Sequence, residues 1–180
     1  MTNLLADDHS EVDLLLRDLW REFDRGATRA VFERLDYFWA RLAVHIRAEH
    51  LHLFRVLLAA TDGAKAAGAQ SAPTREEVRD CVERLREDHD FFMHELAGAV
   101  NEARELASRE GAEVGEALLR IRERVRGVAE RLVEHNQVEE QKVYLWPAAL
   151  FDEAALAELN REMKHEIENL PPRFSEAGPG

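Results

Sequence analysis

The chain has 180 residues, enough for one domain with a continuous hydrophobic core. A net charge of −12 without any basic stripe argues against nucleic acid as a partner, and no run approaches the ~20 apolar residues of a membrane span. A single cysteine, Cys81, excludes an intramolecular disulfide, and the amino terminus lacks the basic start of a signal peptide, so we expect a cytoplasmic protein.

Helix-forming Ala, Leu, Glu and Arg dominate, and apolar residues recur every three or four positions in five stretches. These stretches cover 9–23, 35–56, 78–100, 114–146 and, more briefly, 152–167. Local signals mark their ends: Gly26, the run Thr61-Asp62-Gly63, a capping-box pattern at Thr74 and Glu77, a break near Gly111, and Pro147. The sequence predicts an all-α, up-down-up-down four-helix bundle with a short fifth C-terminal helix, as one domain over 1–170 with a flexible tail at 171–180.

Six polar residues stand where this apolar pattern demands Leu or Ile: His9, His45, Glu49, His89, His135 and Glu139. In two of the stretches a glutamate follows a histidine by four residues, so each pair shares one helix face, one turn apart. The two stretches match further, as His45-x3-Glu49-x4-Phe54 and His135-x3-Glu139-x4-Tyr144. The chain therefore contains an internal repeat of a His-x3-Glu helix.

The spacing between the helices predicts that the four histidines meet in one layer. In an antiparallel pair, His9 and His45 are level if the turn lies midway, at residue 27, and the break falls at Gly26-Ala27. His89 and His135 are level if their turn lies near residue 112, and the break falls at Gly111-Ala112. Neither coincidence was used to select the six residues.

Four imidazoles and two carboxylates in an apolar layer predict a metal site, because a buried carboxylate is costly without a compensating charge. Six such ligands suit two ions, each with two histidines and bridged by both glutamates. Nitrogen and oxygen ligands without a thiolate favour iron, with manganese or zinc possible. The alternative is a metal-free interaction bundle with four core histidines and two salt-bridged glutamates.

The pattern His…His-x3-Glu…His…His-x3-Glu resembles the hemerythrin-like HHE cation-binding family over about residues 4–150. The resemblance also rests on Asp8-His9, Asp88-His89 and the run Tyr144-Leu145-Trp146-Pro147. It implies a bundle with an oxo- or hydroxo-bridged di-iron centre that binds or reduces O2, peroxide or nitric oxide. The alternatives are a non-catalytic oxygen or iron sensor and an oxygen or iron store.

The chain departs from the oxygen-carrying members of that family, which have a fifth histidine from a His-x3-His pair on the third helix. Here Met93 stands at that spacing, and His94 is turned about 140° from His89. We therefore expect two ions with similar, incompletely filled coordination shells. Open coordination positions favour peroxide or nitric oxide chemistry over reversible O2 storage. The alternative is a local bulge in the third helix that brings His94 inward.

Several other polar residues have simpler interpretations. His50 and Glu140 lie off the apolar faces and are expected in solvent, and Asp13 is either a partner of a ligand or a surface charge. Tyr144, with Tyr37, is expected to be a packing residue. His52 lacks a histidine counterpart in the repeat, where Lys142 stands, although Glu49-x2-His52 and Glu162-x2-His165 match a ferritin-like spacing. That alternative leaves His45, His135 and Glu139 unexplained.

Overall fold

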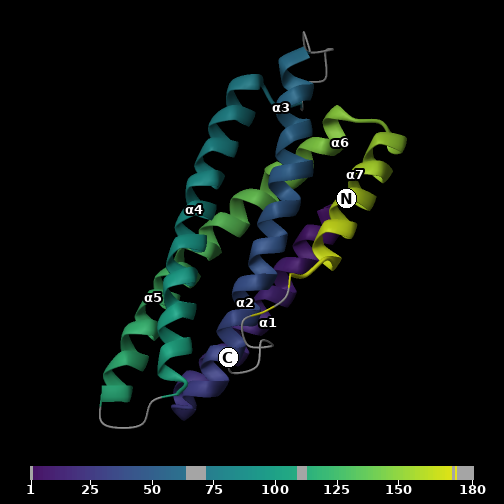
Figure 1. The fold of residues 1–180 in the computed structure, drawn as a ribbon. Coiled ribbons are helices and arrows are strands. Elements are labelled where there is room, and N and C mark those ends of the chain that lie inside the picture. The colour runs from purple at the N-terminus through teal and green to yellow at the C-terminus, as the bar shows by residue number, and fades with distance from the viewer. Residues whose placement is uncertain (1, 64–71, 109–112, 172, 174–180) are drawn as a thin grey trace.

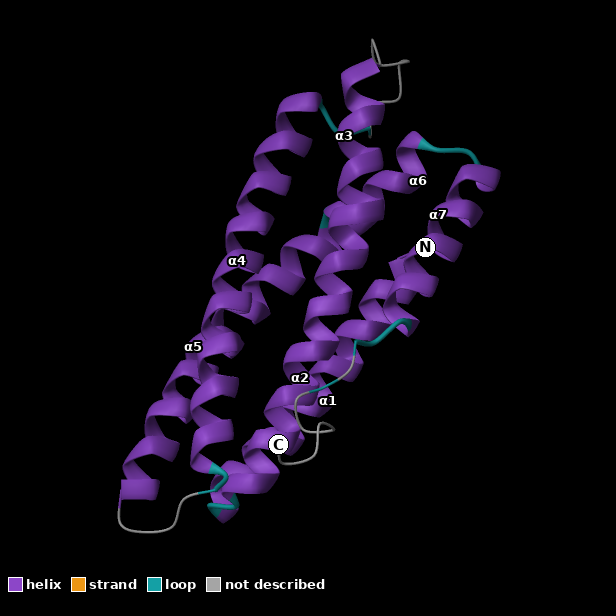
Figure 2. Cartoon of the chain, in the orientation of Figure 1, coloured by secondary structure: helices purple, strands orange, loops and turns teal. Residues whose placement is uncertain are grey.

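The computed structural model describes residues 2–63, 72–108, 113–171 and 173, and this part of the chain is helical with no β-strand (Figure 2). The α-helices are α1 (Thr2–Arg25), α2 (Thr28–Ala48), α3 (Phe54–Gly63), α4 (Arg75–Leu106), α5 (Glu113–Gln141), α6 (Trp146–Leu150) and α7 (Glu153–Glu168). A π-helical turn, Glu49–Leu53, joins α2 to α3, and a 3-10 turn, Val143–Leu145, joins α5 to α6.

The long helices pack side by side around a shared interior (Figure 1). α1 contacts α2, α2 contacts α4, α4 contacts α5, and α5 contacts α1. α7 packs along α2 and the π turn and buries Leu159, Met163 and Ile167. Among the described residues, no helix combines the length and the apolar character needed to cross a membrane.

Several predicted helix ends are confirmed. Gly26 ends α1 with φ +66°, a left-handed conformation that glycine adopts without strain, so the chain reverses immediately into α2. Thr74 and Glu77 form the capping box of α4: the Thr74 hydroxyl accepts from the Glu77 amide at 3.2 Å. Asp152 caps α7. The expected turn at Gly111-Ala112 lies outside the described residues, as does most of the tail at 171–180.

Two predicted boundaries are wrong. The second stretch does not end before Thr61, because α3 continues to Gly63, with the Thr61 hydroxyl donating to the Leu57 carbonyl inside the helix. The fourth stretch is not one helix up to Trp146, because α5 ends at Gln141 and the 3-10 turn follows. Apolar periodicity does not reveal such interruptions, since the side chains beyond them return to the same interior.

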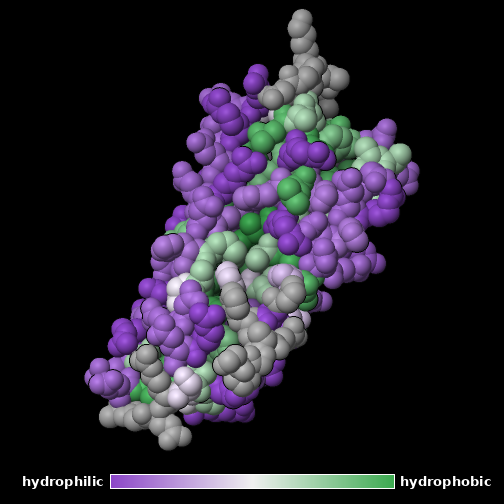
Figure 3. Space-filling model, in the orientation of Figure 1, coloured by the Kyte–Doolittle hydropathy of each residue, from purple (hydrophilic) through white to green (hydrophobic). Residues whose placement is uncertain are grey.

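The interior has two apolar clusters with a polar layer between them. The larger cluster lies between α1, α2, α4 and α5 and includes Phe38, Phe92 and Ile121. The second lies around the π turn, α3 and α7 and includes Phe54, Leu85 and Met163. Hydrophilic residues cover much of the face over α4 and α7, with hydrophobic residues in the strip between them (Figure 3). The two clusters enclose the polar layer from both ends.

Candidate metal centre

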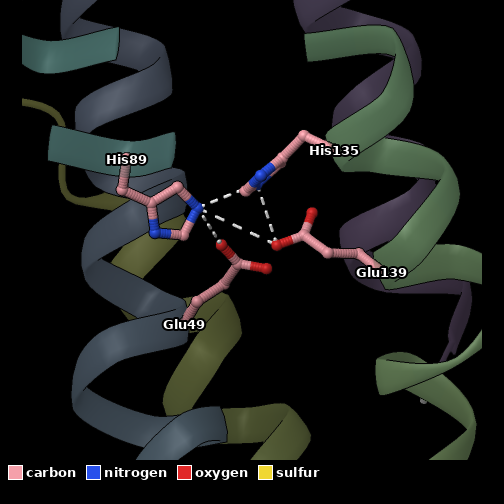
Figure 4. Close-up of side chains that lie close together, drawn as sticks. All are labelled: Glu49, His89, His135 and Glu139. Atoms are coloured by element: carbon pink, nitrogen blue, oxygen red, sulfur yellow. Dashed lines mark hydrogen bonds and ion pairs between the residues drawn. The ribbon is translucent and has the colours of Figure 1, made fainter. Parts of the chain in front are cut away.

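All six predicted residues lie in this polar layer, and each is buried. Their exposed fractions are 5% or less, and those of Glu49 and Glu139 are 0%. They come from different elements: His9 from α1, His45 from α2, Glu49 from the start of the π turn, His89 from α4, and His135 and Glu139 from α5. Four helices therefore supply one compact cluster, part of which is drawn in Figure 4.

The cluster has two halves that share Glu139. Glu49, His89, His135 and Glu139 offer ligand atoms that all lie within 4.8 Å of one another, and so do His9, His45 and Glu139. The Nε2 atoms of the His9/His45 pair are 3.1 Å apart, and those of the His89/His135 pair are 2.9 Å apart. Ligand atoms on adjacent corners around an ion with bonds of about 2.1 Å stand about 3.0–3.4 Å apart.

The two carboxylates divide their oxygens between the halves. Glu139 Oε2 lies 3.3 Å from His9 Nε2, whereas its Oε1 lies 3.1 Å from His135 Nε2. Glu49 Oε1 lies 3.7 Å from His45 Nε2, whereas its Oε2 lies 3.3 Å from His89 Nε2. Glu139 could thus give one oxygen to an ion in each half, and Glu49 could do the same if its Oε1 moved slightly toward His45.

The outer nitrogen of every imidazole is held by a neighbour. His45 Nδ1 is 2.8 Å from Asp8 Oδ2 and His135 Nδ1 is 3.0 Å from Asp88 Oδ2. A carboxylate only accepts, so these Nδ1 atoms carry the hydrogen and the inward Nε2 atoms of neutral rings carry lone pairs. Arg41 pairs with Asp8 and Arg131 with Asp88, which holds the two aspartates in place.

Two of these outer partners were expected in solvent. His50 is instead half-buried, with its Nε2 2.8 Å from His89 Nδ1, whereas Glu140 is exposed as expected but also places its Oε1 2.7 Å from His9 Nδ1. Both follow a glutamate of the cluster by one residue, so a rotation of about 100° turns them toward the adjacent helix. The Glu140 side chain is 44% exposed, so it is both partner and surface residue.

Tyr144 is the functional residue that sequence reasoning missed. Its side chain is buried, and its hydroxyl donates to Glu49 Oε1 at 2.7 Å and lies 3.1 Å from both Glu139 Oε2 and His9 Nε2. The repeat Glu-x4-aromatic was the available signal. It was not decisive, because positions five apart on a regular α-helix face about 140° away from each other.

Charge is poorly balanced in this layer without an ion. Burial and the Glu139 carboxylate raise the pKa of Glu49 to about 8, while burial lowers the pKa of His45 and of His89 to about 4. Burial alone would lower the pKa of His9, but the hydrogen bond and charge of Glu139 raise it to about 9. Glu49 Oε2 and Glu139 Oε1 are buried without a hydrogen bond in the described part of the chain. A cation in each half would balance the charge of the buried carboxylates and accept the lone pairs of the neutral imidazoles.

The remaining candidates lie away from the cluster. His94 is exposed on α4, as expected, and Asp13 is exposed on α1. His52 is half-buried and lies 3.3 Å from Glu162 of α7, while His165 is exposed, so the ferritin-like spacing does not bring its residues into the layer. The six residues of the polar layer are therefore the candidate ligands.

No model of a known protein family matches the chain, and no curated protein or solved structure shows significant similarity to it. What the structure supports is an all-helical protein with a buried histidine and glutamate cluster that can hold metal ions.

Proposed function

We propose that the chain is a hemerythrin-like protein that holds two iron ions and binds or reduces small oxidants. In this proposal α1, α2 with α3, α4 and α5 form an up-down-up-down four-helix bundle, and α7 is its short fifth C-terminal helix. The functional domain covers 1–170. His9, His45, Glu49, His89, His135 and Glu139 are the ligands.

One observation supports this proposal above all others. Four imidazole nitrogens and four carboxylate oxygens converge in a dry layer, with the nitrogens paired at 3.1 and 2.9 Å. Neutral imidazoles in this arrangement point lone pairs at each other, which is unfavourable unless a cation or a proton lies between them. Two bridging carboxylates supply two negative charges, which suits two adjacent cations.

The donor set favours iron over the other candidates. Imidazole and carboxylate without thiolate are typical ligands of iron and manganese in non-haem sites, and zinc pairs suit them less well. Iron supplies one- and two-electron redox chemistry with O2, peroxide or nitric oxide when bound. The protein's own contribution is to hold the imidazoles through Asp8 and Asp88 and to exclude water with the two apolar clusters.

The incomplete ligand set favours a site open to a small molecule. His94 is exposed, so it does not supply the fifth histidine of an oxygen carrier. The partner we propose is a small oxidant, not nucleic acid, since the net charge of −12 repels phosphate. A cytoplasmic location remains part of the proposal.

Metal analysis of the protein purified aerobically, with its optical spectrum, tests the assignment. We expect two iron ions per chain and near-ultraviolet absorption from an oxo-bridged ferric pair. One ion or fewer per chain after full reconstitution contradicts the di-iron proposal. His94→Ala serves as the matched control, because it removes a histidine from the same helix without touching the layer.

A sensor is the second candidate, and one contact favours it. Arg41 pairs with Asp8, the partner of His45, and also donates to the Ile167 carbonyl at the end of α7 at 2.9 Å. A change at the centre can therefore reach α7. Turnover with peroxide without a change in protease sensitivity of α7 supports the enzyme, and the opposite result supports the sensor.

A further inference from the structure

The cluster and its surroundings are built twice around a pseudo-two-fold axis. Residues of α1 recur 80 positions later on α4, for example His9 and His89. Residues of α2 recur 90 positions later on α5, for example His45 and His135. The recurring residues are Asp8 and Asp88, His9 and His89, Arg41 and Arg131, His45 and His135, and Glu49 and Glu139. Their contacts recur too: arginine holds aspartate, and aspartate holds the second histidine of each pair.

The repeat breaks at two positions beside the centre. Phe54 corresponds to Tyr144, and His50 corresponds to Glu140. Each is equivalently placed: Tyr144 lies against His9, with ring centroids 5.6 Å apart, and Phe54 stacks on His89 at 5.9 Å. The His9/His45 half therefore has a phenol and a carboxylate where the His89/His135 half has a phenyl ring and an imidazole.

We infer that the two ion positions are inequivalent: the Tyr144 oxygen is an additional ligand in the His9/His45 half, and small exogenous ligands bind in the His89/His135 half. This inference rests on the proposed di-iron function and deepens it. It replaces the expectation of two similar half-filled ions, which follows from the histidines and glutamates alone.

The distances around the Tyr144 oxygen support its role as a ligand in the His9/His45 half. Its oxygen lies 3.1 Å from His9 Nε2, 3.4 Å from His45 Nε2, 2.7 Å from Glu49 Oε1 and 3.1 Å from Glu139 Oε2. These values match the separations of adjacent ligand atoms around one ion, about 3.0–3.4 Å, with the Glu49 contact shortened by a hydrogen bond. Five donor atoms thus surround one position. A ferric ion bound there would displace the phenol proton to solvent.

The other half has four donor atoms and an apolar wall. Phe54 stacks on His89 with 11° between the ring planes, and the Phe92 ring meets His135 edge-on at 5.1 Å. Neither ring offers a donor, so the coordination positions that Tyr144 fills in one half lack a protein donor in the other. A small ligand such as azide or nitric oxide needs a metal position without a protein donor, and this half offers one.

Substitutions at the two aromatic positions test the inference, with ferric iron loaded into the protein and azide as the probe. Wild type should show the visible charge-transfer absorption and resonance Raman ring modes of an iron-bound phenolate. Tyr144→Phe should lose them and keep two iron ions. Tyr37→Phe is the matched control, because Tyr37 is the other tyrosine of the chain, and it should change neither.

The exchanged protein, Tyr144→Phe with Phe54→Tyr, should regain a phenolate band, and its azide binding should move to the other half. Phe54→Tyr alone should weaken azide binding by about tenfold or more, while Tyr144→Phe does not weaken it. Two bound irons without a phenolate band in wild type, or a band that persists in Tyr144→Phe, overturns the inference alone. One iron or fewer in wild type contradicts the proposed function instead.

Discussion

The metal-free protein should lose stability as the pH rises from 6.5 to 9, because folding raises the pKa values of Glu49, His9 and His135 in the polar layer. In the folded chain the pKa of Glu49 is raised to about 8, first by burial and then by the Glu139 carboxylate. The pKa of His9 is raised to about 9, because the hydrogen bond and charge of Glu139 outweigh burial. The unfolded chain has ordinary values near 4.5 and 6.5.

A group with a raised pKa holds a proton in the folded state that the unfolded state has already released. Stability therefore falls with rising pH, by about 1.4 kcal/mol per pH unit for each proton. Above pH 6.5, Glu49 contributes until about pH 8 and His9 until about pH 9, so these two groups lose about 2 and about 3 kcal/mol, on the order of 5 kcal/mol together. His45 and His89, whose pKa values are lowered to about 4 by burial, are neutral in both states above pH 6.5 and add nothing.

Urea unfolding of metal-free protein at pH 6.5 and pH 9, followed by far-ultraviolet circular dichroism, measures this loss. Glu49→Gln should show a smaller decline, because its amide does not titrate, and metal-loaded protein should show little decline, because ions replace the protons. Equal or greater stability of the metal-free wild type at pH 9 would refute the reasoning. The loss is large against a typical folding free energy of about 5–15 kcal/mol.

Three further substitutions test other parts of the structure. His89→Ala should abolish the di-iron spectrum, whereas His94→Ala, at an exposed position, should keep full metal content and change the free energy of unfolding by less than about 0.5 kcal/mol. Asp88→Asn should weaken metal binding by about 10–100-fold in a chelator competition, with exposed Asp90→Asn as the control that leaves it unchanged. Gly127→Ala should raise the free energy of unfolding by about 0.5–1 kcal/mol in urea titrations, since an added Cβ meets no atom within 4 Å in α5; a loss would show hidden strain there.

The positions of the six candidate ligands could be predicted from the apolar repeat of the helices, the His-x3-Glu spacing and the turn at Gly26. A polar residue in an apolar seam is visible without coordinates, and Gly26 fixes the level of His9 against His45 by ending α1 midway between them. Burial of all six then follows from the seam itself.

The contacts of Tyr144, His50 and Glu140 could not be predicted, for two physical reasons. Tyr144 reaches the layer only because α5 stops at Gln141 and the chain turns tightly before it, and no Gly or Pro marks that stop. His50 and Glu140 lie a third of a turn from their glutamates, and whether such a side chain meets a neighbour or water depends on the distance between helices. Sequence periodicity carries no information on that distance.

The π turn at Glu49–Leu53 also determines how this chain tolerates changes in length. Its wide winding accommodates one residue more than an α-helical turn, and that residue brings Phe54 back over the layer that Glu49 faces. Deleting one residue from 50–53 would restore regular α-helical winding and leave Phe54 four positions after Glu49, on the same face of the helix. Phe54 and Leu57, both fully buried, would therefore keep facing the core. A single-codon deletion here is better tolerated than one inside α2, where the same loss would rotate every later residue by about 100°.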